Sequence, residues 1–114
     1  MNNDITLEQL SQVHLQAQAE ARAAAAKFFN EQLGGQDQFA CGFAWVNVPV
    51  KASTKLGRKL AQIGFRKAYG GGMQLWNPSE FGCQNIDTLE HGATAYARVF
   101  TANGIEAYSQ SRLD

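Results

Sequence analysis

The sequence has no excess of charge of one sign, since ten lysines and arginines balance ten aspartates and glutamates. The molecule as a whole therefore has no long-range field that would draw it to nucleic acid or to an anionic membrane, and any electrostatic binding must be local. A long apolar run is also missing. The longest, residues 39–46, suits a strand and is far shorter than the ~20 residues of a membrane-spanning helix. We therefore expect no membrane role.

Cysteine is scarce, with Cys41 and Cys83 as its two positions. One disulfide is possible by number, but the polar start of the chain does not resemble a secretory signal peptide, so we expect two free thiols in a reducing cytosol. No cysteines and histidines have the paired, close spacing of a structural zinc site, and we expect neither a metal nor a cofactor. Apolar residues make up 45% of the chain and charged residues 18%, which is typical of a globular domain.

The sequence predicts a single domain, residues 1–114. Its first part, residues 1–35, contains a long alanine-rich helix, and residues 36–114 form an α/β core. The helix should span residues 5–33, from a capping box of Thr6 and Gln9 to the glycine pair Gly34-Gly35. We expect its apolar seam to cover the domain's own sheet, with self-association as the alternative. The seam consists of Leu7, Leu10, His14, Ala17, Ala21, Ala24 and Phe28, and His14 is interpreted as a core residue.

The strand predicted from Phe39 to Val48 alternates large and small side chains. Its large face would consist of Phe39, Cys41, Phe43 and Trp45, and its small face of Ala40, Gly42, Ala44 and Val46. Because both faces are apolar, the pattern predicts a central strand that is covered on both sides. The alanine-rich helix is the candidate for close packing against the small face.

Four further elements follow along the chain. They are a helix that begins at Thr54 and ends at Gly64, a strand from Met73 to Trp76, a helix opened by a capping box of Asp87 and Glu90 and ending near Ala102, and a strand from Ile105 to Tyr108 before a polar tail, Ser109 to Asp114. The order α-β-α-β-α-β predicts a small, three-stranded and largely parallel sheet packed by helices. A homo-oligomer that extends so small a sheet is compatible with this fold.

Positive charge is concentrated in residues 51–67, which hold six of the ten cations and no acid: Lys51, Lys55, Arg58, Lys59, Arg66 and Lys67. Such a patch suits a phosphate, a nucleic-acid backbone or an acidic protein surface. Tyr69 and Trp76 lie nearby in the sequence as possible stacking platforms. The alternative is that these cations form the solvated side of the second helix.

Two features beyond this segment also suit an anion. The glycine run around Gly71 follows a helix and enters a strand, the reverse of a phosphate loop, so we expect a turn where a ligand can still lie against bare backbone. Arg112 follows a short strand and suits bidentate recognition of carboxylate or phosphate, with a loose tail as the alternative. The candidate ligand-binding residues are therefore Lys55, Arg58, Lys59, Tyr69, Gly71, Trp76 and Arg112.

A thiol site is the one catalytic arrangement that the sequence suggests. Cys83 lies in a loop before the helix that carries His91, and Asp87 is one helical turn from that histidine. Asp87 is better explained as part of a helix cap, so we expect no catalytic residues. A thiol-dependent hydrolase or transferase remains an alternative.

Several short segments resemble small tailed-phage accessory proteins without an assigned activity. The segments are Ala40-Cys-Gly-Phe-Ala-Trp-Val46, Gly70-Gly-Gly-Met-Gln-Leu-Trp-Asn-Pro78, Gly92-Ala-Thr-Ala-Tyr-Ala-Arg-Val99, Gly104-Ile-Glu-Ala-Tyr108 and Ser111-Arg-Leu-Asp114. The resemblance implies an accessory protein that acts in a bacterial host cytoplasm.

The residues and the resemblance together predict a non-enzymatic binding protein of phage type. Its partner would be a host protein or a small anionic, nucleotide-like ligand, with nucleic acid possible but not favoured, and its role could be host takeover or counter-defence. A minor virion or assembly protein is a further alternative, in which the alanine seam would serve assembly.

Overall fold

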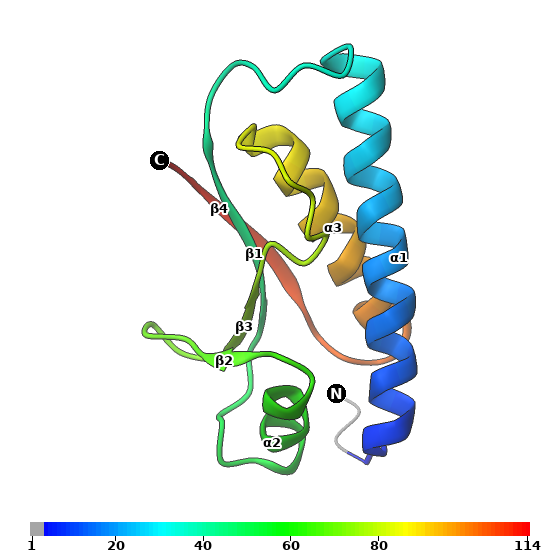
Figure 1. Ribbon diagram of the computed structural model, residues 1–114. Helices are drawn as coiled ribbons and strands as arrows, with labels where there is room; N and C mark the ends of the chain where they lie inside the picture. The colour runs from blue at the N-terminus through cyan, green and yellow to red at the C-terminus, as the bar shows by residue number, and fades with distance from the viewer. Residues whose placement is uncertain (1–3) are drawn as a thin grey trace.

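The computed structural model describes residues 4–114, and the polar start at residues 1–3 lies outside that range. The elements are α1 (Leu7–Gln32), β1 (Gly42–Val48), α2 (Lys55–Gln62), β2 (Arg66–Lys67), β3 (Met73–Trp76), α3 (Ile86–Ala102) and β4 (Tyr108–Leu113). Helix α1 runs along the whole molecule, and α2 lies at one end of it (Figure 1). None of the described helices is long and apolar enough to cross a membrane.

The helix ends follow the local sequence closely. The capping box of Thr6 and Gln9 is present at the start of α1, and Gly34 and Gly35 adopt φ angles of 62° and 77° after its last turn, which favours glycine at both positions. Thr54 caps α2 as expected. The cap of α3 is Asn85 and not Asp87, which lies in the first turn instead. Asparagine and aspartate cap helices about equally well, because the side-chain oxygen of either can accept a hydrogen bond from a backbone amide in the first turn. Asn85 and Asp87 were therefore both suitable caps by residue type.

The expected three-stranded, largely parallel sheet is wrong. The sheet has four strands in the order β2-β3-β1-β4, and every neighbouring pair is antiparallel. Strands joined through a helix, β1 with β2 and β3 with β4, do run in the same direction, as a crossover requires. Each such pair is separated by one strand that runs the other way, which is the split βαβ arrangement.

Strand β4 lies in the segment expected to be a polar tail, while Ile105 and Ala107 are buried in the loop before it. Ser109 and Ser111 face α3, where their hydroxyl groups hydrogen bond to Thr94 and Glu90, and Gln110 and Arg112 point to the opposite side. Both sides of this edge strand are therefore polar. It lacks the alternation of apolar and polar residues from which a strand is predicted in a sequence.

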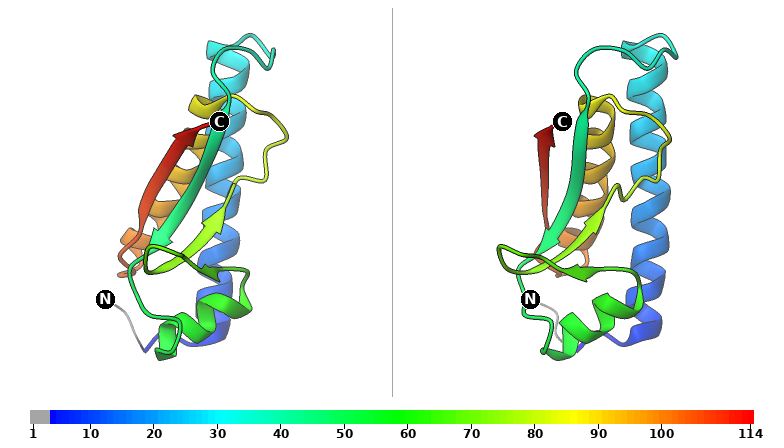
Figure 2. Two further views of the ribbon diagram at one scale, coloured as in Figure 1. Left: turned by 90° about the vertical axis from the view of Figure 1, so that its left-hand side faces the viewer. Right: turned by 60° about the vertical axis from the view of Figure 1, so that its left-hand side comes forward.

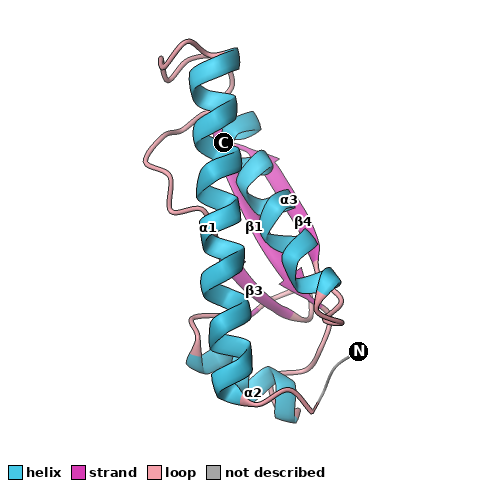
Figure 3. Ribbon diagram, turned by 90° about the vertical axis from the view of Figure 1, so that its right-hand side faces the viewer, coloured by secondary structure: helices cyan, strands magenta, loops and turns pink. Residues whose placement is uncertain are grey.

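The two faces of the sheet differ in what covers them. Helices α1 and α3 lie on one side (Figure 3), and no described element lies in front of the other side, which we call the open face (Figure 2, left). The small side chains of β1 point to the helices: Ala44, Val46 and Val48 are buried. Phe43 and Trp45 point to the open face, so the expectation that β1 is covered on both sides is wrong.

Helix α3, and not the alanine-rich α1, packs against the small face of β1. A Cβ placed on Gly42 would lie 2.5 Å from Ile86 Cδ1 of α3. Helix α1 packs instead on α3, through Ala17, Ala21 and Ala25, which are fully buried. Part of the expected seam is displaced around the helix axis, since Leu7 is exposed and Val13 is buried. The alanine stripe is thus used inside the domain.

Candidate functional site

Aromatic rings from the two central strands gather on the open face. Trp45 of β1 is the direct partner of Trp76 of β3, and their ring centroids are 4.7 Å apart at an interplanar angle of 19°. Phe43 meets the same Trp76 ring edge-on, at 5.8 Å and 63°. We call Trp45, Trp76 and Phe43 the ring row. Trp76 is 43% exposed and Phe43 38%, so this row is an apolar patch in contact with solvent.

The stacked indoles stand upright on the sheet. Two rings that lay flat and side by side on neighbouring strands would have centroids farther apart than 4.7 Å. Trp76 therefore has one face against Trp45, and it also meets the Phe43 ring edge-on. Trp45 stands at the end of the row, where one of its faces has no ring of the row against it.

An open hollow of about 680 Å³ lies beside Trp45, and we call it the first hollow. Trp45 lines it, whereas its stacking partner Trp76 does not. The loop from Gly70 to Gly72 also lines it. A volume above ~300 Å³ with an aromatic wall is typical of sites for small ligands.

Amide side chains form the polar part of the first hollow. Gln110 accepts a 2.7 Å hydrogen bond from the Trp45 indole nitrogen through Oε1, and its NH₂ group remains as a donor. Asn47 donates from Nδ2 to the Gly71 carbonyl at 3.1 Å, and its Oδ1 remains as an acceptor. Gln74 lines the same hollow. The arrangement offers both a donor and an acceptor to a polar ligand edge.

The glycine loop brings bare backbone to the first hollow. Gly71 and Gly72 have φ angles of 110° and 81°, which other residues rarely adopt. A Cβ on Gly72 would lie 2.5 Å from the Asn47 side chain, whereas nothing lies within 4 Å of one on Gly70 or Gly71. The main chain at Gly70 and Gly71 is therefore open to the approach of a ligand.

Two arginines frame the open face. The Arg112 guanidinium carbon lies 5.4 Å from the Phe43 ring centroid and 5.7 Å from that of Trp76, which is a cation–π arrangement with both rings. Arg66 of β2 pairs with Gln74 in register and so points to the same side of the sheet. Lys51 lines the first hollow. None of the described residues that line this hollow is acidic, so it suits an anion.

The cations of α2 are not part of this arrangement. Lys55 and Arg58 are exposed on α2, at the end of the molecule seen in Figure 1. Lys59 donates from Nζ to the Ile5 carbonyl at 2.7 Å and so holds the start of α1. The basic segment reaches the open face through Lys51 and Arg66 instead.

The comparisons with protein-family models, curated proteins and solved structures find no match. Function has to be inferred from the open face. Of the residues singled out in the sequence, Gly71 lines the first hollow, Trp76 and Arg112 belong to the ring row and its cation, and Tyr69 is fully exposed in the loop beside it. Trp45, Phe43 and the amides were missed as site residues.

The thiol arrangement is not supported by the geometry. His91 stacks on Phe28 at 4.3 Å and its Nδ1 hydrogen bonds to the Asp87 carbonyl, and neither contact involves Cys83. Burial raises the pKa of the Cys83 thiol, which disfavours the thiolate that a nucleophile requires. Among the described residues, no group of three His, Cys, Asp or Glu side chains could hold a metal ion.

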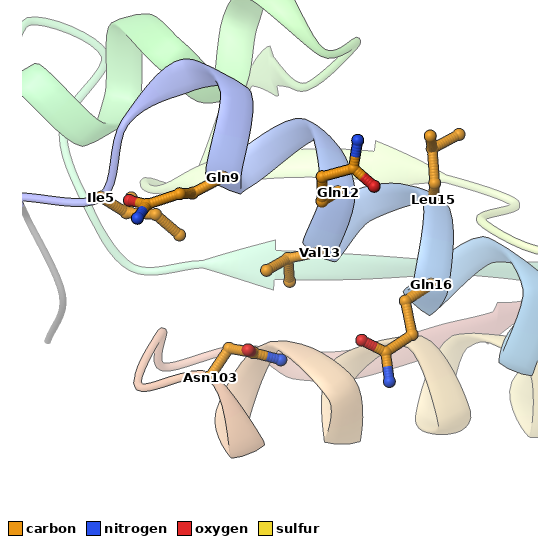
Figure 4. A pocket seen from close by; sticks show the side chains of 7 residues that line it. All are labelled: Ile5, Gln9, Gln12, Val13, Leu15, Gln16 and Asn103. Carbon is orange, nitrogen blue, oxygen red and sulfur yellow. The ribbon is translucent and has the colours of Figure 1, made fainter.

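A larger hollow of about 750 Å³ lies between the first half of α1 and the end of α3. Figure 4 shows Gln16 of α1 and Asn103 on opposite sides of it. Its walls are glutamine, asparagine and aliphatic side chains, with neither a ring nor a charged group among the described residues that line it. It therefore offers a ligand fewer kinds of interaction than the first hollow, although it is larger.

His14 makes stability depend on pH. Its Nδ1 lies 2.6 Å from the hydroxyl of buried Tyr96, and burial lowers its pKa below the ordinary 6.5, partly offset by Glu80. The folded state therefore favours the neutral ring, and the unfolded chain binds the proton more readily. Stability should be complete above pH ~6.5 and decline as the pH falls below it.

Urea unfolding at pH 7.5 and 5.5 tests this expectation. The wild type should be less stable at the lower pH, and His14→Gln should reduce the difference because it removes the titrating group. Equal pH dependence of the two proteins would contradict this account of His14.

Proposed function

We propose that this chain is a non-enzymatic binding protein that holds a small anionic, nucleotide-like ligand in the first hollow. The observation that carries the proposal is the position of Trp45, which stacks on Trp76 and also lines the first hollow. A flat base in this hollow could stack on the indole. Base–aromatic stacking contributes about 1–3 kcal/mol per base.

The remaining walls complement the other parts of a nucleotide. The donor of Gln110 and the acceptor of Asn47 suit the polar edge of a base. Lys51 and the backbone around Gly71 suit a phosphate, because none of the described residues that line the hollow carries a carboxylate to repel it. The ring of the base, its polar edge and the phosphate of a nucleotide are thus each matched by different residues of the first hollow.

The resemblance to tailed-phage proteins extends the proposal to an accessory protein that acts in the cytoplasm of a bacterial host. Removal of a host nucleotide, in host takeover or counter-defence, would need binding and no catalysis. A role in the virion rested on the alanine seam of α1, and Ala17 and Ala21 are buried against α3 within the chain. The assembly alternative therefore has less support than the ligand.

Isothermal titration calorimetry with AMP, GMP, CMP and UMP tests the proposal. We expect at least one of them to bind the wild type, and Trp45→Ala to weaken that binding about 10- to 100-fold through the loss of stacking. Trp45→Phe should recover part of the affinity because it retains a ring.

Leu15→Ala is the matched control, because Leu15 is an exposed apolar side chain on α1 outside the first hollow. It should leave the affinity unchanged. If no mononucleotide bound at millimolar concentration, or if Trp45→Ala and Leu15→Ala behaved alike, the proposal would be wrong.

A further inference from the structure

We infer that the open face takes two consecutive bases, so that its preferred ligand is a single-stranded oligonucleotide and not a mononucleotide. This inference rests on the proposed function, because the first base would occupy the first hollow. It adds a second position at the other end of the ring row and a cation between the two.

A second hollow, of about 380 Å³, opens at the Phe43 end of the ring row. This hollow exists because β3 ends at Trp76, after which the chain no longer pairs with β1. The chain returns to β1 at Gln84, whose carbonyl accepts a hydrogen bond from the Gly42 amide at 3.0 Å. Phe43 and Trp76 line this second hollow toward the open face, and Gly42, Ala44 and Leu89 line it toward the helices, so it lies at the edge of β1. Trp45 does not line it. The ring row thus has a ligand-sized hollow at each end.

The polar lining of the second hollow also suits a base. Asn77 and Gln84 supply amide groups, and Asp114 supplies a carboxylate that can accept from an amino or imino group on a base edge. Asp114 is held there by a 3.1 Å hydrogen bond from its amide to the Cys41 carbonyl. Neither Asn77 nor Gln84 lines the first hollow, so the two positions have separate polar groups.

Arg112 lies where the backbone between two such bases would pass. Its guanidinium is over Phe43 and Trp76, which line the second hollow, and Trp76 stacks on Trp45 of the first hollow. A guanidinium stacked on a ring still presents N–H donors to a phosphate. The side chains that the central and edge strands direct to the open face are aromatic, amide or arginine residues, and Arg66 extends the positive margin beyond β3.

The upright rings favour a single strand over a duplex. In a duplex the bases are paired and stacked on one another, so their faces are not available to Trp45 or Phe43, whereas an unpaired strand can splay its bases onto protein rings. The face is also apolar at its centre, which a binding site that recognised phosphates alone would not need.

The test compares UMP, the dinucleotide UpU and a uridine hexamer by calorimetry, with parallel AMP, ApA and adenosine hexamer titrations. We expect the better dinucleotide to bind at least 10-fold more tightly than its monomer, and the hexamer to gain less than that over the dinucleotide. Phe43→Ala should bring the dinucleotide close to the affinity of the monomer and leave the monomer unaffected. Arg112→Gln should weaken the dinucleotide and lower its dependence on salt.

Three results would overturn the inference. A monomer that binds as tightly as its dinucleotide would leave the proposed function standing and remove the second position. A duplex, or poly-glutamate, that competes as well as the hexamer would show that the face responds to charge and not to bases. Failure of monomers and oligomers alike would remove the proposed function as well. Leu15→Ala is again the matched control and should change none of these affinities.

Discussion

Asn85→Ala is expected to lower the free energy of unfolding by about 3 kcal/mol or more, because several buried partners depend on this one side chain. Asn85 is fully buried, and its Oδ1 accepts from the Thr88 amide at 2.8 Å and from the Thr88 hydroxyl at 2.9 Å. Its Nδ2 donates to the Gln38 carbonyl at 2.8 Å. Alanine would remove the cap of α3 and leave these groups without partners.

Urea unfolding of Asn85→Ala and Asn103→Ala measures this effect against a matched control. Asn103 lies at the other end of α3, is exposed, and donates from Nδ2 to the Val99 carbonyl at 2.8 Å. Water can replace that bond, so we expect its loss to cost less than about 1 kcal/mol. Similar losses for the two variants would show that Asn85 does not have the role assigned to it.

Gly42→Ala is expected to cost about 1–3 kcal/mol, because β1 and α3 approach too closely there for even one methyl group. The added Cβ would lie 2.5 Å from Ile86 Cδ1 and 2.6 Å from the Arg112 carbonyl oxygen. Ile86 could turn aside, but the carbonyl belongs to β4, which pairs with β1, and cannot retreat without disturbing the ladder. The change would therefore strain the sheet itself.

Thermal unfolding of Gly42→Ala alongside Gly70→Ala separates crowding from the intrinsic effect of the substitution. A Cβ on Gly70 has no neighbour within 4 Å, so this control should retain the melting temperature of the wild type. If Gly42→Ala melted together with Gly70→Ala, the close packing of β1 on α3 would be refuted.

The sequence predicted the helices better than the sheet, for a physical reason. Helix ends are determined by residues within one turn, and Thr6 and Thr54 have the capping roles predicted for them. Strand direction depends on pairing between distant segments. The short, exposed β2 that turns the chain back before β3 has no apolar pattern by which it could be recognised.

The candidate site was predicted in part. Trp76 was singled out as a stacking platform near the basic segment, Gly71 as bare backbone, and Arg112 as an arginine directly after a strand. Trp45 and Phe43 were assigned to a buried face, since an aromatic alternation has the same appearance whether a helix covers it or not. The covering elements are distant in sequence, and strand β1 alone could not reveal their absence.

The stack of Trp45 on Trp76 has a practical consequence. These are the two tryptophans of the chain, so its indole emission and the tryptophan part of its near-ultraviolet circular dichroism arise from one place on the surface. Rings this close couple electronically, and the coupling depends on their separation and angle. A ligand that bound against Trp45 or separated the two rings would change both spectra. Binding at the open face can therefore be followed from the intrinsic tryptophan signals, without a label.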